Sequence, residues 1–440
     1  MIDLLIRGSE VDIAIEDGVI SAIGPQLQSA KNEIDARGLA ILPGLIDVHV
    51  HFNEPGRADW EGSETGSRAF AAAGGTLFFD MPLNSSPCTL TKGDFAEKCR
   101  ALERSSTTNF GLWGGIVPGN RPHLPELGAC GAVGFKAFLC DSGLPEFPRA
   151  DDLTLYEGML EAARMGLPVA VHAESEEITK ALSSRLIAAG RTDIPAFLQS
   201  RPLLAEVEAI ERASLLAHEA KCKLHVVHIS SGRGVAAALE ARSRGTDISI
   251  ETCPHYLFFT EEDLLKVGAI LKCTPPLRGA NERDTLRDFL QRGLVDIIGS
   301  DHSPCPPAMK EKDSFFAIWG GIAGIQSTLS VLLQRGLPLS DIARLTAANP
   351  AKRFGIADRG ALQVGNRADL VLLDTAASYT LQPDALLQRH RLSPYLGHRF
   401  QGVVRQTYRD GELIFSNGKI VTESRGKLVT PSHAKPGIHA

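Results

Sequence analysis

Two histidines that stand two residues apart, His49 and His51, end an apolar stretch that begins at Ile41. The stretch is apolar enough for a β-strand buried on both faces, and side chains two positions apart leave a strand on the same side. Two imidazoles on one face at a strand end can bind a single metal ion. So short a motif also occurs without a metal, with one histidine packed in the core and the other capping the strand, so it needs support from the rest of the chain.

Four more potential ligands stand near the ends of other apolar stretches. They are Lys136 in Gly-Phe-Lys-Ala-Phe, His172 in Val-His-Ala-Glu, His228 in Val-His-Ile-Ser and Asp301 in Gly-Ser-Asp-His. Imidazole and carboxylate suit Zn²⁺, Mn²⁺, Co²⁺ or Fe²⁺, and a set without cysteine disfavours a structural thiolate site. The sequence therefore predicts a centre of two divalent metal ions.

Lys136 is the unusual member of this set, because an ammonium group has three donors and no lone pair to offer a cation. If carbon dioxide adds to the amine, the resulting carbamate is an anion whose two oxygens can bridge two metal ions. An unmodified lysine in a salt bridge is the alternative.

Apolar strand-like stretches alternate with longer helical ones between about residues 40 and 355, which is typical of βα units around a parallel sheet. Eight strands are predicted, at 41–51, 76–81, 109–117, 133–140, 168–174, 223–229, 247–253 and 295–301. Eight such units favour an α/β fold, a (β/α)₈ barrel of the TIM type. The C-terminal ends of its strands meet, so the potential ligands are expected to converge there.

The two ends of the chain differ from its middle. Short alternating strands with Asp-Gly and Asn-Gly turns occur before residue 40 and after residue 360. Neither end has enough strands for a stable sheet of its own, so we expect residues 1–40 and 360–425 to combine into a small β-sandwich beside a barrel of residues 41–359. Residues 426–440 are predicted to form a loose tail, since two prolines follow there without apolar periodicity.

Composition excludes several classes of function. The net charge is −6 on 440 residues and Lys and Arg are scattered, which argues against nucleic-acid binding. There is no apolar run of about 18 residues and no signal peptide, so we expect no membrane association and a cytoplasmic location. The eight cysteines include no Cys-x-x-Cys pair and are expected to be free thiols.

Over nearly its whole length the chain resembles the amidohydrolase superfamily, and within it the cyclic amidohydrolases, which include hydantoinases, dihydroorotases and allantoinases. The resemblance rests on the motifs above, the composite sandwich, and the segments Asn349-Pro-Ala-Lys-Arg-Phe-Gly and Gly365-Asn-Arg-Ala-Asp-Leu-Val. It implies two metal ions per subunit, zinc first among the candidates, and a homotetramer. The implied ligands are His49, His51, His172, His228 and Asp301, with carboxylated Lys136 (N6-carboxylysine) as the bridge.

The loops that would read the substrate differ from those of dihydroorotases, which bind a carboxylate with an arginine in His-x-His-x-Arg and a histidine in Asp-x-x-Pro-His. Here Asn53 and Cys305 stand at those two positions. Without the arginine there is no bidentate clamp, and burying an unpaired anion costs several kcal/mol, roughly enough to abolish useful binding. A neutral ring is therefore the expected small-molecule substrate.

Longer motifs are similar to those of the allantoinases. They begin at His51 (His-Phe-Asn-Glu-Pro-Gly-Arg), Met81 (Met-Pro-Leu-Asn-Ser-Ser-Pro), Lys272 (Lys-Cys-x-Pro-Pro-Leu-Arg) and Asp301 (Asp-His-Ser-Pro-Cys-Pro-Pro). This resemblance implies hydrolysis of the ring amide of allantoin to allantoate by a metal-bridging hydroxide. The alternatives are another cyclic amidohydrolase activity, such as that of a hydantoinase, a dihydropyrimidinase or a dihydroorotase, and a metal-free relative that acts as a scaffold.

Asn84, Cys273 and Ser303 are candidates for holding the neutral ring and its ureido arm, Cys273 through its backbone, because loops at this face of a barrel carry the binding residues. In the alternative these residues only shape their turns. Asp301 is expected to be a metal ligand and also the catalytic proton carrier, as the only carboxylate side chain of the ligand set. In the alternative it only coordinates, and solvent or His302 moves the proton.

Overall fold

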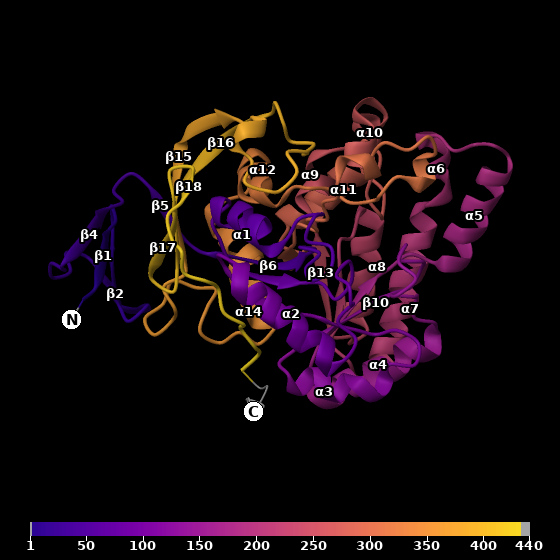
Figure 1. The fold of residues 1–440 in the computed structure, drawn as a ribbon, viewed down its shortest axis with the longest axis horizontal. Helices are drawn as coiled ribbons and strands as arrows, with labels where there is room; N and C mark the ends of the chain where they lie inside the picture. The colour runs from indigo at the N-terminus through magenta and orange to yellow at the C-terminus, as the bar shows by residue number, and fades with distance from the viewer. Residues whose placement is uncertain (1, 433–440) are drawn as a thin grey trace.

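The computed structural model describes residues 2–432 and has two parts that lie side by side (Figure 1). At one side, β-sheets are built from both ends of the chain, in indigo and yellow. The other part is a barrel of parallel strands with helices around it, formed by the middle of the chain.

Within the described residues, eight positions around the barrel are filled by parallel strands. In chain order they are β6 (Leu45–Val50), β7 (Gly75–Asp80), β8 continued by β9 (Asn109–Leu112 and Gly114–Gly115), β10 (Phe135–Phe138), β11 (Val169–His172), β12 (Leu224–Val226), β13 (Ile248–Thr252) and β14 (Ile297–Ile298). They pair in two runs, β6-β7-β8 and β9-β10-β11-β12-β13-β14. A parallel bridge between Val50 and His302 links the first strand to the chain after the last one. The predicted (β/α)₈ barrel is confirmed.

The interior of the barrel is a packed apolar core, and Trp113 is part of it. Trp113 stands between β8 and β9, is fully buried, and packs with apolar side chains of other strands, among them Val48 and Ala170. Its indole Nε1 donates a hydrogen bond of 2.9 Å to the carbonyl of Val48 in β6. The break between the two runs of strands is thus tied to the strand that carries the first histidine.

Helices follow the strands and cover the outside of the barrel (Figure 1). They are α1 (Ser63–Ala72), α2 (Lys92–Ser105), α3 (Leu124–Ala129), α4 (Asp152–Met165), α5 (Glu176–Ala188), α6 (Ile194–Ser200), α7 (Leu203–Ala220), α8 (Gly232–Ser243), α9 (Pro254–Phe258), α10 (Glu261–Val267), α11 (Ala280–Gln291), α12 (Thr328–Gln334), α13 (Leu339–Ala343) and α14 (Asn349–Arg353). Local signals fix their ends: at α4, the Asp151 side chain accepts from the Thr154 N–H, and Gly166 ends the helix with a φ of 68°.

The two ends of the chain form the sandwich together. One sheet has the order β3-β2-β1-β4 (Val19–Gly24, Asp12–Glu16, Leu4–Arg7, Asn32–Asp35), and the other has the order β18-β17-β16-β15-β5 (Lys419–Ile420, Glu412–Ser416, Arg399–Arg409, Leu370–Thr380, Ala40–Pro43). Ile6 and Ile15 of the first sheet pack with Leu370 and Tyr408 of the second in one apolar core. An N-terminal and a C-terminal segment are therefore needed to bury one another.

The stretch predicted as a single strand at 41–51 is divided between the two parts of the protein. β5 pairs with β15 in the sandwich, with Pro43 opposite Leu370, whereas β6 begins at Leu45 in the barrel. Pro43 has no N–H to continue a ladder, and a Cβ on Gly44 would come within 2.4 Å of the Thr76 side chain. The single-strand prediction was wrong because the chain changes sheets at this Pro-Gly pair.

The beginning of the predicted loose tail, 426–440, is ordered. The Gly426 N–H donates to the Ser106 carbonyl at 2.7 Å, Leu428 forms a parallel bridge with Phe110, and the Val429 N–H donates to the Phe110 carbonyl at 2.7 Å. This prediction was wrong up to Ser432, because the segment extends the pairing of β8. Residues 433–440 lie outside the described residues.

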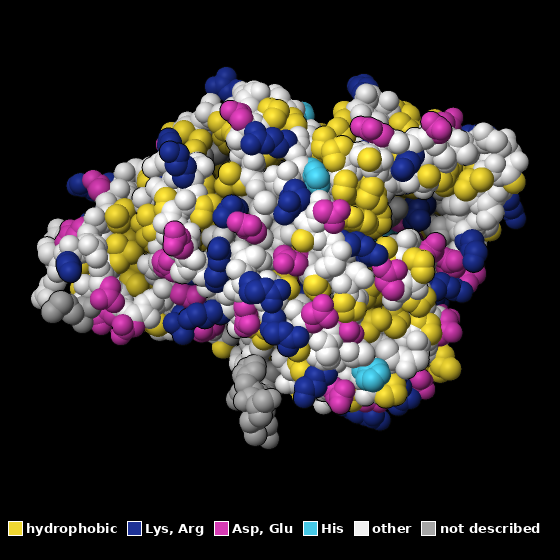
Figure 2. Space-filling view, in the orientation of Figure 1, with side chains coloured by type: hydrophobic (Ala, Val, Ile, Leu, Met, Phe, Trp, Pro, Cys, Tyr) yellow, Lys and Arg dark blue, Asp and Glu magenta, His cyan; other side chains and the backbone are white. Residues whose placement is uncertain are grey.

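Charges of both signs are interspersed on the face seen in Figure 2, without a large area of one sign among the side chains shown there. In the part of the chain that the structure describes, the helices are too short or too polar to cross a membrane. The potential ligands stand at the C-terminal ends of the barrel strands, and this end of the barrel is therefore where a functional site is expected.

Candidate active site

His49, His51 and Asp301 meet where β6 and β14 end. The Nε2 atoms of His49 and His51 lie 3.3 and 3.4 Å from Oδ1 of Asp301. Ligand atoms of the three residues all lie within 4.8 Å of one another, and the three side chains come from opposite ends of the barrel sequence. Since two imidazoles and a carboxylate at such separations can share one divalent ion, these residues form a candidate metal site.

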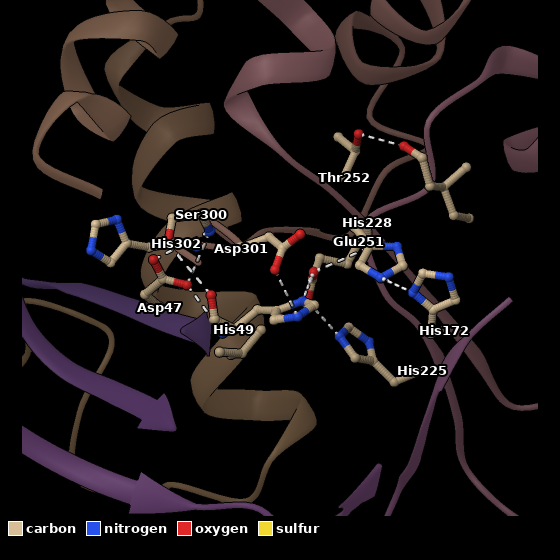
Figure 3. A network of polar contacts seen from close by, with 12 residues as sticks. Asp47, His49, His172, His225, His228, Glu251, Thr252, Ser300, Asp301 and His302 are labelled. Atoms are coloured by element: carbon tan, nitrogen blue, oxygen red, sulfur yellow. Dashed lines mark hydrogen bonds and ion pairs between the residues drawn. The ribbon is translucent and has the colours of Figure 1, made fainter. Parts of the chain in front are cut away.

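A second pair of imidazoles faces each other beside this group. Nδ1 of His172, at the end of β11, lies 3.0 Å from Nε2 of His228, which follows β12 (Figure 3). Burial lowers the pKa of His172, and it lowers that of His228 well below its ordinary value, so both rings are neutral near pH 7. Neutral imidazole is the form that binds metals, and the pair is oriented to hold a second ion.

Glu251 in β13 is a fully buried carboxylate that orients these ligands (Figure 3). Its Oε1 lies 2.8 Å from Nδ1 of His49 and accepts the backbone N–H of His228 at 3.2 Å, and its Oε2 lies 2.8 Å from Nε2 of His225. Burial alone would raise the pKa of Glu251, but His49 and the hydrogen bond with His225 lower it to about 2. Because the carboxylate holds the proton of His49 on Nδ1, the lone pair on Nε2 points toward Asp301.

Glu174 orients His172 in the same way. Its Oε2 lies 2.8 Å from Nε2 of His172 and 2.6 Å from Nη1 of Arg201. Burial would raise the pKa of Glu174, but the charge of Arg201 and the hydrogen bond with His172 lower it to about 2. The ionised carboxylate therefore keeps the His172 proton on Nε2 and leaves Nδ1 free to face His228.

Lys136 in β10 is completely buried, and its Nζ finds no hydrogen-bond partner among residues 2–432. Burial lowers the pKa of Lys136 to about 8, with Glu251 and Asp301 acting in the opposite direction. Its nearest described aromatic contact is the Phe138 ring, 5.1 Å from Nζ, and that ring stacks on His172. Burying an ammonium group without a hydrogen-bond partner costs free energy. The Lys136 amine therefore needs a partner group that the described side chains do not provide.

The backbone is strained where two of the ligands stand. His228 and Asp301 have φ values of 41° and 44°, in the left-handed region that side chains other than glycine rarely adopt. Asp47 supports the second turn, because its Oδ1 accepts the N–H groups of Ser300 and His49, each at 3.1 Å. Burial raises the pKa of Asp47 to about 6, with those hydrogen bonds opposing the shift. The site therefore depends on turns that are held by side chains rather than by regular pairing.

His302 is turned away from the other histidines (Figure 3). Its Nδ1 accepts the N–H of Gly324 at 3.1 Å, its Nε2 lies 3.8 Å from Glu61, and the side chain is fully buried. This geometry disfavours His302 as the alternative proton carrier, because its ring is fully buried and faces Gly324 and Glu61.

A cleft of about 330 Å³ opens over the candidate ligands. Its wall contains all the predicted ligands except the buried Lys136, and it also contains Asn84, Cys273 and Ser303, the three residues predicted to hold the substrate. Asn53 and Cys305 are not part of this wall. The Asn53 amide donates to the Pro304 carbonyl at 3.4 Å, and Cys305 lines a separate small cavity.

No role for Glu251, Glu174 or Asp47 was predicted from the sequence. The sequence holds a signal for one of them, because Asp47 stands two residues before His49 on β6 and shares its face. Glu174 lies two residues after His172, beyond the end of β11, so strand alternation does not place it. Glu251 offers no such signal, because it reaches His49 across 202 positions of sequence and only the closed barrel brings the two together.

Side chains that could hold metal ions converge in this part of the barrel. Four imidazoles, one ionised carboxylate and one unpartnered amine converge within the described chain. The carboxylates of Glu251 and Glu174 fix the tautomers of His49 and His172. Burial would raise the pKa of Asp301, but His49 and His51 lower it below its ordinary value, so the carboxylate is ionised.

Comparison with known proteins places these residues in a family. Residues 40–414 match the amidohydrolase family. The chain is 60% identical over 456 aligned positions to an allantoinase of Solibacter usitatus, which covers 100% of both chains. It is 48% identical to an allantoinase of Deinococcus radiodurans, covering 98% of this chain and 99% of the relative.

Solved structures agree with the sequence relatives at the level of the fold. An L-hydantoinase (dihydropyrimidinase) from Arthrobacter aurescens superposes with a TM-score of 0.95 at 34% identity, over 98% of this chain and 100% of the other. A D-hydantoinase superposes with a TM-score of 0.91 at 29% identity, over 98% and 99%. Both the barrel and the composite sandwich are thus shared across the full length.

The position of Glu251 generates a prediction. In Glu251→Gln the two histidine donors face an amide with a single acceptor oxygen, so one ring must turn or lose its partner, and metal affinity should fall by about 10- to 100-fold. Competition with a chromophoric chelator measures this directly. The same change at the exposed Glu240 of α8 is the matched control; equal metal affinity in both variants would contradict the orienting role.

Proposed function

This chain belongs to the amidohydrolase family, and we propose that it hydrolyses the ring amide of allantoin to give allantoate. The observation that carries the proposal is the convergence of four histidines, an ionised aspartate and an unpartnered buried lysine beneath one cleft. The relatives that match over the full length are allantoinases at 40–60% identity, which selects the substrate within the family.

Two divalent metal ions fit the donor set, with zinc as the first candidate. His49, His51 and Asp301 would hold one ion and His172 with His228 the other, and a carbamate on Lys136 would join them. The carbamate supplies the anion that the buried amine otherwise lacks. When bound, the ions supply Lewis acidity that polarises the amide carbonyl and makes water acidic enough to attack near neutral pH.

Asp301 moves the proton. Its carboxylate is ionised, lies in the wall of the cleft and is in reach of both His49 and His51, so Oδ2 can accept a proton from the attacking water. The same carboxylate then donates that proton to the departing ring nitrogen. His302 cannot substitute, because its ring nitrogens face Gly324 and Glu61 in the interior.

A neutral ring suits this cleft better than an anionic one. The cations that reach its wall, Arg201 and Lys272, are already paired, with the Glu174 carboxylate and with backbone carbonyls respectively. Cys305 lies outside the wall, and Asn53 holds a backbone carbonyl instead of an anion. A substrate carboxylate would therefore have to displace an existing partner, whereas the carbonyl and N–H groups of a ureide require no countercharge.

The metal identity, the carbamate, the homotetramer and the cytoplasmic location stay predictions. Contacts of Asn84, Cys273 and Ser303 with the ring and the ureido arm are likewise proposed, on the ground that all three line the cleft beside the ligands.

Side-by-side turnover of four rings tests the proposed function. We expect metal-loaded enzyme to open allantoin with the highest kcat/KM, hydantoin and dihydrouracil more slowly, and dihydroorotate hardly at all, because the last carries an anion. Release of the ring-opened product is measured for each. Preference for hydantoin or dihydrouracil would assign the chain to the hydantoinase group, and protein that binds no metal and opens none of the rings would support a metal-free scaffold.

Removal of the Lys136 amine tests the bridging group. Lys136→Ala should lose activity and bind less metal, because a small side chain cannot supply the bridging anion, and short carboxylic acids such as acetate or propionate should restore part of both. Metal content by elemental analysis and activity with and without the acid are the measurements. Lys180→Ala on the surface of α5 is the control; full activity of Lys136→Ala without acid would exclude the carbamate bridge.

Asp301→Asn separates coordination from proton transfer. The amide keeps the shape and one oxygen donor but cannot carry a proton, so at least one metal ion should remain bound while kcat falls by about 10²- to 10⁴-fold, the usual range for a lost general acid or base. Metal content and kcat are measured on the same preparation. If two ions remain and kcat stays within a few-fold of wild type, Asp301 is a ligand only.

A further inference from the structure

An irregular loop from Pro306 to Gly321 roofs the cleft. Met309 and residues 316–321 belong to the wall of the same cleft as the metal ligands. Apart from two short 3₁₀ turns, at Pro307–Met309 and Phe315–Ala317, the loop has no regular structure. Its backbone groups therefore need partners from elsewhere, because an unpaired buried carbonyl is costly.

Lys272 supplies partners for three of these carbonyls. The residue is 3% exposed, and its Nζ donates to the carbonyls of Phe315, Phe316 and Ile318 at 2.6, 3.3 and 2.5 Å. These bonds use all three hydrogens of the ammonium group. The Lys272 carbonyl also accepts the Gly321 N–H at 2.9 Å, so this residue is bonded to the C-terminal half of the roof through both its side chain and its backbone.

Lys310 completes the arrangement from within the loop. Its Nζ donates to the carbonyls of Trp319 and Gly321 at 2.9 and 2.8 Å. The two lysines together bind five carbonyls between Phe315 and Gly321. The two lysine side chains thus supply the hydrogen bonds that a neighbouring strand would supply in a sheet.

Aromatic contacts define how the roof is placed. The Lys272 ammonium lies 4.8 Å from the centre of the Phe197 ring, which packs edge-on against Phe315 at 5.2 Å. Trp319 packs edge-on against Trp60 at 4.9 Å. The roof is therefore anchored at both sides, to α6 and to the loop after β6, and Lys272 lies between these anchors.

We propose that Lys272 and Lys310 are positioning residues that set substrate specificity, because they hold the roof closed over the part of the substrate that projects from the reacting ring. The roof presents Phe316, Ile318 and Trp319 at a fixed height over the cleft. A compact neutral arm such as a ureido group fits beneath a roof at fixed height, whereas a bulky arm requires it to open. Among the described residues, neither lysine side chain is hydrogen-bonded to a metal ligand. Lys272 belongs to the cleft wall and Lys310 does not, so the Lys310 variant isolates the effect that reaches the reaction through the loop.

This inference rests on the proposed function, since it concerns the arm of the allantoin molecule. Three rings separate the possible effects: unsubstituted hydantoin has no arm, allantoin has a compact polar arm, and 5-benzylhydantoin has a bulky one. Methionine keeps the length of the lysine stem without its donors, so Lys272→Met and Lys310→Met are the variants. Two independent variants guard against the case in which one fails to fold.

In both variants kcat/KM for allantoin should fall by about 10- to 100-fold, mainly through KM, as expected when positioning is lost at a distance from the chemistry. Turnover of hydantoin should stay within about threefold, the metal content should equal that of wild type, and 5-benzylhydantoin should be opened faster than by wild type. Trypsin should also cut faster after the exposed Lys312, since a released roof is accessible to protease.

Lys312→Met is the matched control, because it removes an exposed lysine from the same loop and should leave all three rates unchanged. Equal losses on hydantoin and allantoin, or a lower metal content, would mean that the lysines only stabilise the fold and would overturn the inference. Unchanged allantoin kinetics with unchanged proteolysis would also overturn it. Failure of wild-type enzyme to open allantoin would refute the proposed function, whereas the proteolysis readout of the roof would still apply.

Discussion

The site depends on how a carboxylate is kept ionised in the interior. A charged group that leaves water costs several kcal/mol unless hydrogen bonds replace its hydration, and Glu251 replaces that hydration entirely with donors from the protein. Each donor is thereby fixed in place, which orients His49 and the turn at His228. Glu174 is kept ionised in the same way by Arg201 and His172, and it fixes the orientation of His172. The metal ligands are rigid because the carboxylates behind them cannot tolerate the loss of a partner.

Much of the fold and of the ligand set could be predicted from the sequence. His49 and His51 are visible because strand periodicity places them on one face, and Asp301 and His228 because a barrel gathers its strand ends. What could not be predicted depends on distant contacts. No local pattern announces that Glu251 meets His49, and the chain changes sheets at Pro43 because of Thr76 and the pairing with Leu370, which only the folded structure supplies.

The hydrogen bonds that hold the roof of the cleft also could not be predicted from the sequence. The sequence assigns Lys272 no role beyond the first position of a motif, because lysines are mostly exposed on protein surfaces. Its actual role depends on three carbonyls of a loop without regular structure, and such a loop has no sequence periodicity to interpret. Loops that line a barrel cleft combine freedom of shape with a need for hydrogen-bond partners. In this protein the buried side chains of Lys272 and Lys310 provide those hydrogen bonds.

The joined ends of the chain bear on its synthesis. Strand β5 acquires its partner β15 only after the whole barrel sequence has left the ribosome, and the sheet that begins at Leu4 stays without its companion for as long. At roughly 5–20 residues per second, this interval lasts on the order of tens of seconds. During it an apolar sheet face with open edges is exposed in a nascent polypeptide, so early translation intermediates are natural clients for chaperones. The barrel can begin to fold during elongation, whereas the sandwich has to wait for chain termination.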